Sequence, residues 1–177
     1  MGKRILLALA ILILTVLLAG TALGEFSEDI ISFNPRNAQV VNAYGSWKIA
    51  ADNIWLLDFG PNQAQADQAL RVIHHYRLNQ QCFVGRPAPS MQYYLCNGRA
   101  PAGPMPGEDS IRFDNSNLRV VNYNGRWKIV EGTSHAMLDF GSNEEEAWTA
   151  LRIIRKYEFN YLCFVGRPHA PMMYFRR

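Results

Sequence analysis

Hydrophobic and polar positions follow the same pattern twice along this chain. Residues 33–93 align with residues 113–174 with one inserted residue in a loop, and more than half of the aligned positions outside that loop are identical. The run Cys-Phe-Val-Gly-Arg-Pro stands at 82–87 and again at 163–168. Because repetition fixes the architecture of a chain, we expect two copies of one structural unit.

Each copy begins with an alternating pattern that predicts a β-hairpin. In the second copy, Asn124-Gly125 supplies the two positive φ angles of a tight turn. This turn places Trp127 and Ile129 on one face of the hairpin, and the first copy has Trp47 and Ile49 at the matching positions. We expect this face to be the core face, with Trp47 and Trp127 as its largest side chains.

A third strand and a helix follow in each copy. The third strand ends with Leu-Asp-Phe-Gly, at 57–60 and 138–141. Asn62 and Asn143 then stand three residues before Gln65 and Glu146, which is the spacing of an N-cap in a capping box. Alanine, leucine, isoleucine and tyrosine recur at helical spacing over 66–76 and 147–157. The Cys-Phe-Val-Gly-Arg-Pro run predicts a fourth strand, and residues 91–95 and 172–175 predict a fifth.

The fold class that this pattern predicts is α+β. We expect two tandem copies of a small β-β-β-α-β-β unit, each a mainly antiparallel sheet with one helix packed on it. The first unit covers residues 25–95, a Pro/Gly-rich linker covers 96–110, and the second unit covers 111–177. A unit of this length buries only about 60% of its unfolded surface, so we expect the two units to pack on each other or on a partner.

Residues 1–24 have the features of a secretion signal. Lys3 and Arg4 precede an apolar run, and Ala22-Leu23-Gly24 offers the small-x-small pattern that signal peptidase reads. The apolar run is about 15 residues, shorter than the roughly 20 that span a bilayer. This favours a cleaved signal over an uncleaved anchor and predicts a secreted protein, extracellular or on the cell surface.

Composition and charge exclude two classes of partner. Loss of Lys3 and Arg4 with the signal leaves 16 basic and 15 acidic residues, a net charge of +1. Phosphate backbones need lysine and arginine clustered on one face. We therefore expect neither nucleic acid nor, after signal cleavage, a membrane as a partner. The 49% hydrophobic content is typical of a globular chain.

The three cysteines allow more than one interpretation. Cys82 and Cys163 occupy equivalent positions in the two copies, where small buried hydrophobic residues are favoured. A bridge between Cys82 and Cys163 is the alternative, which requires a Cα separation below about 7 Å. Cys96 stands alone in the linker and could pair with a partner chain.

Catalytic and metal-binding chemistry finds little support. His74 and His75 lie near Cys82 in sequence, but the second copy has Arg155 and Lys156 in their places. A thiol that needed an imidazole base would be inactive in that copy. No histidine or cysteine pair has zinc spacing, and no acidic run forms a calcium loop. We expect no enzyme activity, no catalytic residue, no metal and no cofactor.

The polar residues shared by both copies predict an ion pair. Asp58 and Arg86 flank the same helix at strand ends, as do Asp139 and Arg167. A carboxylate and a guanidinium brought together there would form a bidentate, partly buried pair. The alternative is that the arginines contact a ligand. The candidate ligand-binding residues are then Arg86, Arg167, Trp55, Tyr93 and Tyr174.

The motifs Leu-Asp-Phe-Gly and Cys-Phe-Val-Gly-Arg-Pro resemble an uncharacterised family of secreted tandem-repeat proteins. The resemblance covers almost all of the mature chain and implies export and repetition, but no activity.

The function that we expect is a secreted non-enzymatic binding module whose two units engage an extracellular glycan or protein. Two weak sites on one chain gain avidity, and the chain has aromatic rings that suit sugars or protein interfaces. One alternative is an inhibitor of secreted proteases that presents the loop 86–90, where two prolines resist cleavage. A hydrolase is the weakest alternative, because the copies share no set of nucleophile, base and orienting group.

Overall fold

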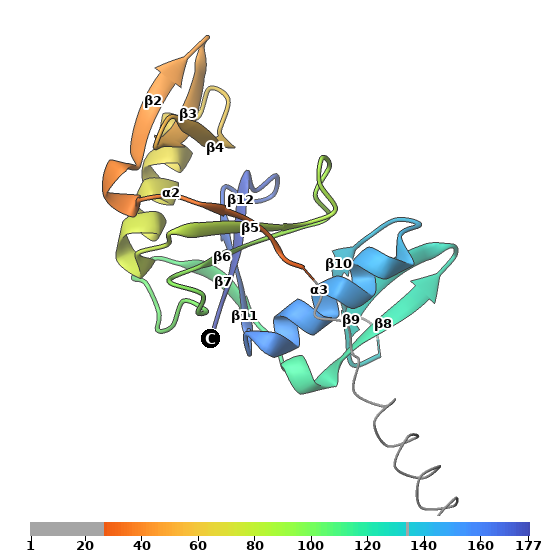
Figure 1. Cartoon of the computed structure of the whole chain (residues 1–177). Helices are drawn as coiled ribbons and strands as arrows, with labels where there is room; N and C mark the ends of the chain where they lie inside the picture. Colours follow the sequence, from red (N-terminus) through yellow and green to blue (C-terminus); the bar gives the residue numbers. More distant parts are fainter. Residues whose placement is uncertain (1–26, 134) are drawn as a thin grey trace, which may run out of the picture.

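A computed structural model describes residues 27–133 and 135–177 of the chain (Figure 1). The predicted signal at 1–24 lies outside these residues. Both repeats have the same order of elements. The first contains β1 (Asp29–Ser32), the 3-10 turn η1 (Pro35–Asn37), β2 (Gln39–Ala43), β3 (Ser46–Ala51), β4 (Ile54–Asp58), α2 (Gln63–Tyr76), β5 (Gln80–Val84) and β6 (Met91–Leu95). The second contains β7 (Asp109–Arg112), η2 (Asn115–Asn117), β8 (Leu118–Tyr123), β9 (Arg126–Glu131), β10 (His135–Asp139), α3 (Glu144–Lys156), β11 (Tyr161–Val165) and β12 (Met172–Arg176).

This order confirms the predicted α+β fold with two β-β-β-α-β-β repeats, and adds a short strand, β1 or β7, before each. The described strands form four antiparallel three-stranded sheets. The two outer sheets are β2-β3-β4 and β8-β9-β10, each a continuous meander. The two inner sheets are β1-β5-β6 and β7-β11-β12. The outer sheets lie at opposite ends of the molecule, and the inner sheets lie between them (Figure 1).

The hairpin turn and the helix starts form at the residues that the sequence predicts. Asn124 and Gly125 have φ angles of 52° and 77°, and the turn pairs Asn122 with Trp127. At the helix starts, Asn62 and Asn143 are the N-caps, and each side chain accepts a hydrogen bond 3.1 Å long from the backbone N–H three residues later. The peptide bonds Arg86–Pro87 and Arg167–Pro168 are both cis.

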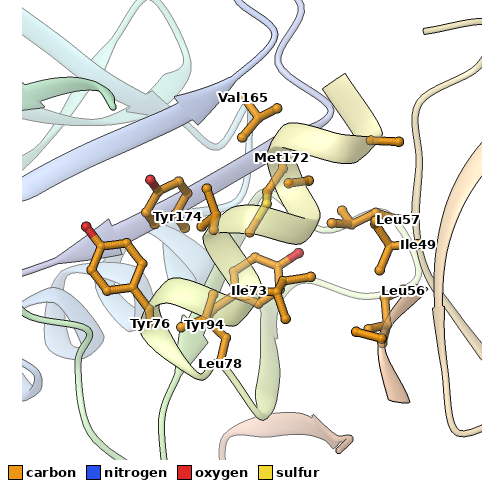
Figure 2. Close-up of a cluster of buried hydrophobic side chains, with 14 of the residues drawn as sticks. Ile49, Leu56, Leu57, Ile73, Tyr76, Leu78, Tyr94, Val165, Met172 and Tyr174 are labelled. Carbon is orange, nitrogen blue, oxygen red and sulfur yellow. The ribbon is translucent and has the colours of Figure 1, made fainter. Parts of the chain in front are cut away.

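Each helix packs against its own outer sheet and against the inner sheet of the other repeat. The buried face of α2 contacts β2 and β3, and it also contacts β11 of the second repeat. Figure 2 shows Val165, Met172 and Tyr174 on one side of α2, and Ile49 and Leu57 on the other side. The hydrophobic cluster around α2 therefore contains residues of both repeats.

The cluster around α3 has the reciprocal composition. Cys82, Val84, Met91 and Tyr93, from the first repeat, pack with the buried face of α3 and with the outer sheet β8-β9-β10. The exchange is not complete, because Tyr94 of β6 belongs to the α2 cluster of its own repeat. The inner sheets also contact each other through β6 and β12. The two repeats are interlocked rather than placed side by side.

The two tryptophans expected to dominate the core are only partly buried. Trp47 and Trp127 pack at the margins of the two clusters, whereas Ile49 and Ile129 on the same strands are fully buried. Each tryptophan stands two residues after the hairpin glycine, near the end of its outer sheet. There the hairpin extends beyond the helix (Figure 1), and each indole is only partly buried. The prediction of the core face is thus correct, and on this face the tryptophans lie at the margin rather than at the centre of the clusters.

Candidate functional site

The outer surface of the sheet β2-β3-β4 is hollowed into an open groove of about 640 Å³. Because side chains alternate along a strand, Ile49 faces the α2 cluster and its neighbour Ala50 faces the groove. Ala50 pairs with Trp55 on β4, and the Trp55 side chain is 56% exposed. The groove is lined by Asn37, Gln39, Val41, Asn42, Ala43, Ala50, Ala51, Asp52, Asn53, Ile54 and Trp55.

This groove combines one exposed indole with several side-chain amides. Its acidic residue, Asp52, is already engaged, because its two oxygens accept 2.6 Å hydrogen bonds from the Asn34 backbone N–H and from Asn37 Nδ2. Asp52 and Asn53 form the turn before β4 with φ angles of 51° and 64°. Asp52 thus positions the rim of the groove, and the remaining amides are available to a ligand.

The second repeat presents a related but different surface. Trp55 aligns with Ala136, so the indole is absent there, and Tyr123 is instead 65% exposed at the end of β8. Each exposed ring lies near the lysine that both repeats share. Lys48 Nζ is 5.8 Å from the Trp55 ring centre, and Lys128 Nζ is 6.0 Å from that of Tyr123. Both outer sheets therefore expose one aromatic ring beside a lysine, from different strands.

The aspartate of Leu-Asp-Phe-Gly stabilises the outer sheet in each repeat. Asp58 pairs with Lys48 and Ser46 across the strands, and it accepts a 2.9 Å hydrogen bond from the Gly60 N–H. The hydrogen bond from Lys48, with those from Ser46 and Gly60, lowers the pKa of Asp58 to about 2. Asp139 has the same role, with Arg126 at 2.9 Å and Lys128 at 3.5 Å.

The predicted pairing of these aspartates with Arg86 and Arg167 is wrong. Arg86 makes a bidentate pair with Asp29, and Arg167 makes the equivalent pair with Asp109. The physical reason is strand pairing, because Asp29 of β1 lies opposite Phe83 on β5, directly beside the exit toward Arg86. Asp58 lies in a different sheet. Each guanidinium also stacks on a ring, with Arg86 4.9 Å from the centre of Phe83.

Sequence reasoning missed two buried carboxylates at the centre of the molecule. The Glu108 side chain is 3% exposed and accepts hydrogen bonds from Tyr76 (2.7 Å), Tyr174 (2.8 Å) and Arg176 (2.7 Å). Burial acts to raise the pKa of Glu108, but these hydrogen bonds outweigh it and lower the pKa. Tyr76 belongs to the first repeat, so this network joins the two repeats.

Glu28 occupies the equivalent position in the first repeat. Its side chain, 7% exposed, contacts Tyr93 and reaches Lys156 and Tyr157 of the second repeat. Burial, then the hydrogen bond to Glu28, raises the pKa of Tyr157 to about 12. A signal was present in the sequence, because Glu-Asp stands at 28–29 and again at 108–109. The repeat thus includes Glu28 and Glu108, five residues before Phe33 and Phe113.

These networks change the assignment of two candidate ligand residues. Tyr93 is fully buried and Tyr174 is 1% exposed, and each hydroxyl donates to a buried carboxylate. Neither ring is open to a ligand in this structure. Among the candidates named from the sequence, Trp55 is the accessible ring, while Arg86 and Arg167 are half-exposed within their ion pairs.

The three cysteines are free thiols. Cys82 and Cys163 are fully buried in different clusters, so the structure holds them apart and does not contain the alternative bridge. Burial raises the pKa of each to about 12, which opposes the thiolate form that a nucleophile needs. Cys96 is half-buried, at the isolated bridge with Arg99.

Neither metal-binding side chains nor known relatives point to a function. No group of three or more histidine, cysteine, aspartate or glutamate side chains could hold a metal within 27–133 and 135–177. Over the same residues, no helix is long and apolar enough to cross a membrane. No family model, curated protein or solved structure matches the chain.

Proposed function

We propose that the protein is a secreted, non-enzymatic binding module that engages an extracellular glycan or protein through its outer sheets. The observation that carries the proposal is the groove on β2-β3-β4, where Trp55 is 56% exposed among side-chain amides. The ring does not stand alone, because Ile54, 37% exposed, lines the same groove, and apolar side chains among a few polar groups in a concave surface are typical of a binding site.

The composition of the groove suits a saccharide. The flat indole of Trp55 offers a stacking surface for the apolar face of a sugar ring. Gln39, which pairs with Ala50, and Asn53 offer amide donors and acceptors to hydroxyl groups. An aromatic ring also serves as an anchor in protein interfaces, so a protein partner is the other form of the same proposal.

The placement of the two outer sheets indicates how both repeats would act. They lie at opposite ends of the molecule (Figure 1). Two binding faces so arranged would connect two ligand molecules, or two separate points on one polymer, with the avidity of a bivalent binder. Because the rings differ, Trp55 on one sheet and Tyr123 on the other, the two faces would differ in preference.

The test is a comparison of two exposed rings. Trp55→Ala removes the ring inside the groove, whereas Tyr44→Ala removes the fully exposed ring at the hairpin tip outside it. We expect the Trp55 variant to lose at least tenfold in affinity for the neutral polysaccharide that the parent binds, measured by affinity electrophoresis on a panel. The Tyr44 variant should bind as the parent does.

Other outcomes would redirect the proposal. Capture of one purified extracellular protein, abolished by Trp55→Ala, would favour the protein form over the glycan form. Equal behaviour of parent and both variants toward every bound ligand would remove the groove as a site. The protease-inhibitor alternative has less support, because Asp29 and Phe83 hold the Arg86 side chain that such a loop would present.

A further inference from the structure

A second hollow lies where η1 meets the C-terminal end of α2. Its volume is about 560 Å³, and it is lined by Pro35, Arg36, His74 and Arg77. It lies beyond η1 from the Trp55 groove, which ends at Asn37. Three of its four lining side chains carry or can carry positive charge. Such a local cluster is compatible with the small net charge of the whole chain.

The backbone around this hollow is held rigidly from both sides. The Asn34 side chain accepts a 3.1 Å hydrogen bond from the Arg36 N–H, and Pro35 O is 3.1 Å from His74 Nε2. Arg77 ends α2 in the left-handed conformation, with φ of 51°, and the next residue, Leu78, is fully buried. The two arginines therefore project from fixed positions, which lowers the cost of ordering them around a ligand.

The two guanidinium groups are not neutralised within the protein. Across residues 27–133 and 135–177, neither the Arg36 nor the Arg77 guanidinium has a hydrogen-bond or ion-pair partner. The acidic residue on the other side of η1 is Asp52, and its oxygens are engaged by Asn34 and Asn37. Arg86 and Arg167, by contrast, are each satisfied by an aspartate.

The second repeat provides an internal comparison, because it lacks this arrangement. Arg36, His74 and Arg77 align with Ser116, Arg155 and Glu158. Arg155 donates to Leu118 O at 3.0 Å, and Glu158 pairs with Arg177 at 3.4 Å. The equivalent place therefore has one arginine instead of two arginines and a histidine, it has one carboxylate more, and both of its charged side chains have partners.

We propose that the hollow of Arg36, His74 and Arg77 binds a tetrahedral oxyanion, the sulfate or phosphate group of an extracellular ligand. The planar fork of an arginine matches the oxygens of such a group, and two forks from different elements can grip it. Cations at the end of a helix also offset its dipole. That effect does not account for Arg36, which belongs to η1.

The test replaces the two arginines of the hollow with the residues at the equivalent positions of the second repeat. The double variant Arg36→Ser/Arg77→Glu carries the residues of the second repeat, and Glu158 shows that glutamate adopts the same left-handed conformation, with φ of 54°. The control, Arg99→Ser/Arg112→Glu, makes the same change in net charge at two exposed arginines away from the hollow. Binding of dextran sulfate and of uncharged dextran is measured for the full chain.

We expect the double variant to bind dextran sulfate at least tenfold more weakly than the parent, with a shallower dependence on salt, and the control to stay within about twofold. Titration with inorganic sulfate and, separately, phosphate should shift the Arg36 and Arg77 amide resonances of the parent, and the larger response identifies the preferred group. Arg36→Ser alone, which leaves the end of α2 intact, should lose several-fold in affinity for dextran sulfate.

Equal losses of affinity in the double variant and the control would overturn the proposal, as would anion-induced shifts confined to residues outside the hollow. Loss of neutral-glycan binding by Trp55→Ala is a separate result and leaves this one standing.

Discussion

At the scale of single residues, the buried carboxylates Glu28 and Glu108 hold the interlocked repeats together. Each accepts hydrogen bonds from two tyrosines, one of its own repeat and one of the other, and pairs with a cation. A buried charge is tolerated only when it is paired and hydrogen-bonded. The networks are therefore sensitive to the loss of any member.

Glu108→Gln should destabilise the protein strongly. The Arg176 and Glu108 side chains are 7% and 3% exposed, and breaking a buried pair by removing one charge costs about 3–5 kcal/mol. The free energy of unfolding, from urea titration, measures the loss. Glu158→Gln breaks an exposed pair with Arg177 and should change stability by less than about 1 kcal/mol. Similar effects of both substitutions would mean that Glu108 is hydrated.

Arg86→Ala should have a small effect on stability. The side chains of Arg86 and Asp29 are 42% and 39% exposed, and solvent-exposed ion pairs contribute little to stability. The sequence alone suggested a partly buried pair with Asp58, for which the loss would be several times larger. Thermal and urea unfolding of Arg86→Ala and Asp29→Ala, with the double variant, measures the coupling. A coupling as large as that of a buried ion pair would contradict the exposed pairing.

Stability should fall at alkaline pH. Burial raises the pKa of Cys82 and Cys163 to about 12, above the ordinary thiol value of about 8.5. A raised pKa means that the folded state holds the proton more tightly, so this contribution is complete below about pH 8 and is lost as the pH rises toward 12. Urea titrations from pH 7 to 11 should show the decline. Alanine at both positions should make this decline with pH smaller. A decline of unchanged slope would show that the tyrosines cause it.

At the scale of elements, periodicity and capping determined what the sequence could predict. The hairpin register, the helix starts at Asn62 and Asn143, and the strands after each helix follow from contacts within about ten residues. The partner of each helix could not be predicted in this way. Both inner sheets present the same side chains, Cys-x-Val and Met-x-Tyr, so α2 would find an equivalent surface in either repeat. The choice depends on the path of the linker and the packing of the inner sheets.

The candidate site could be predicted only in part from the sequence. Trp55 was identified from the sequence as a ring without an assigned place in the core, but so were Tyr93 and Tyr174, which are buried. Composition cannot distinguish exposed rings from buried ones. Tyrosine suits a surface, and it also suits an interior where its hydroxyl finds a hydrogen-bond partner. That partner was a glutamate directly before β1 or β7, outside the aligned residues. Gly85 and Gly166 are explained by the packing of each inner sheet on the helix of the other repeat. A Cβ on Gly85 would meet Glu146, and a Cβ on Gly166 would meet Gln65, each at the start of that helix.

Asn62→Ala and Asn143→Ala should each destabilise the protein by about 1 kcal/mol, because each removes the acceptor for a backbone N–H in the first helical turn. Thermal unfolding followed by circular dichroism measures this loss. Gln63→Ala, one residue after the cap, leaves the Asn62 hydrogen bond intact and serves as a control. Melting curves of the cap variants that coincide with the parent would show that water replaces the capping oxygen without loss.

At the scale of the whole molecule, the exchange predicts that damage in one repeat appears in the other. Val165→Ala creates a cavity in the cluster around α2, although Val165 belongs to the second repeat. Native-state hydrogen exchange should show reduced protection in α2, by about 2 kcal/mol, with α3 less affected. Val84→Ala is the matched variant and should weaken α3 instead. Loss of protection in the helix of the mutated repeat would contradict the exchanged packing.

Because each helix packs on the inner sheet of the other repeat, the linker between β6 and β7 affects how stability depends on protein concentration. Two separate copies with exchanged inner sheets would form a dimer, whose midpoint of unfolding falls on dilution. In this chain the residues between Leu95 and Asp109 join the copies covalently, and a short flexible connection of this kind holds the second partner at an effective concentration in the millimolar range. The melting temperature should therefore be the same at nanomolar and at micromolar protein. Dilution by any factor therefore leaves both halves of the fold in contact, and a fold completed within one chain retains its stability where a dimer of separate copies would dissociate.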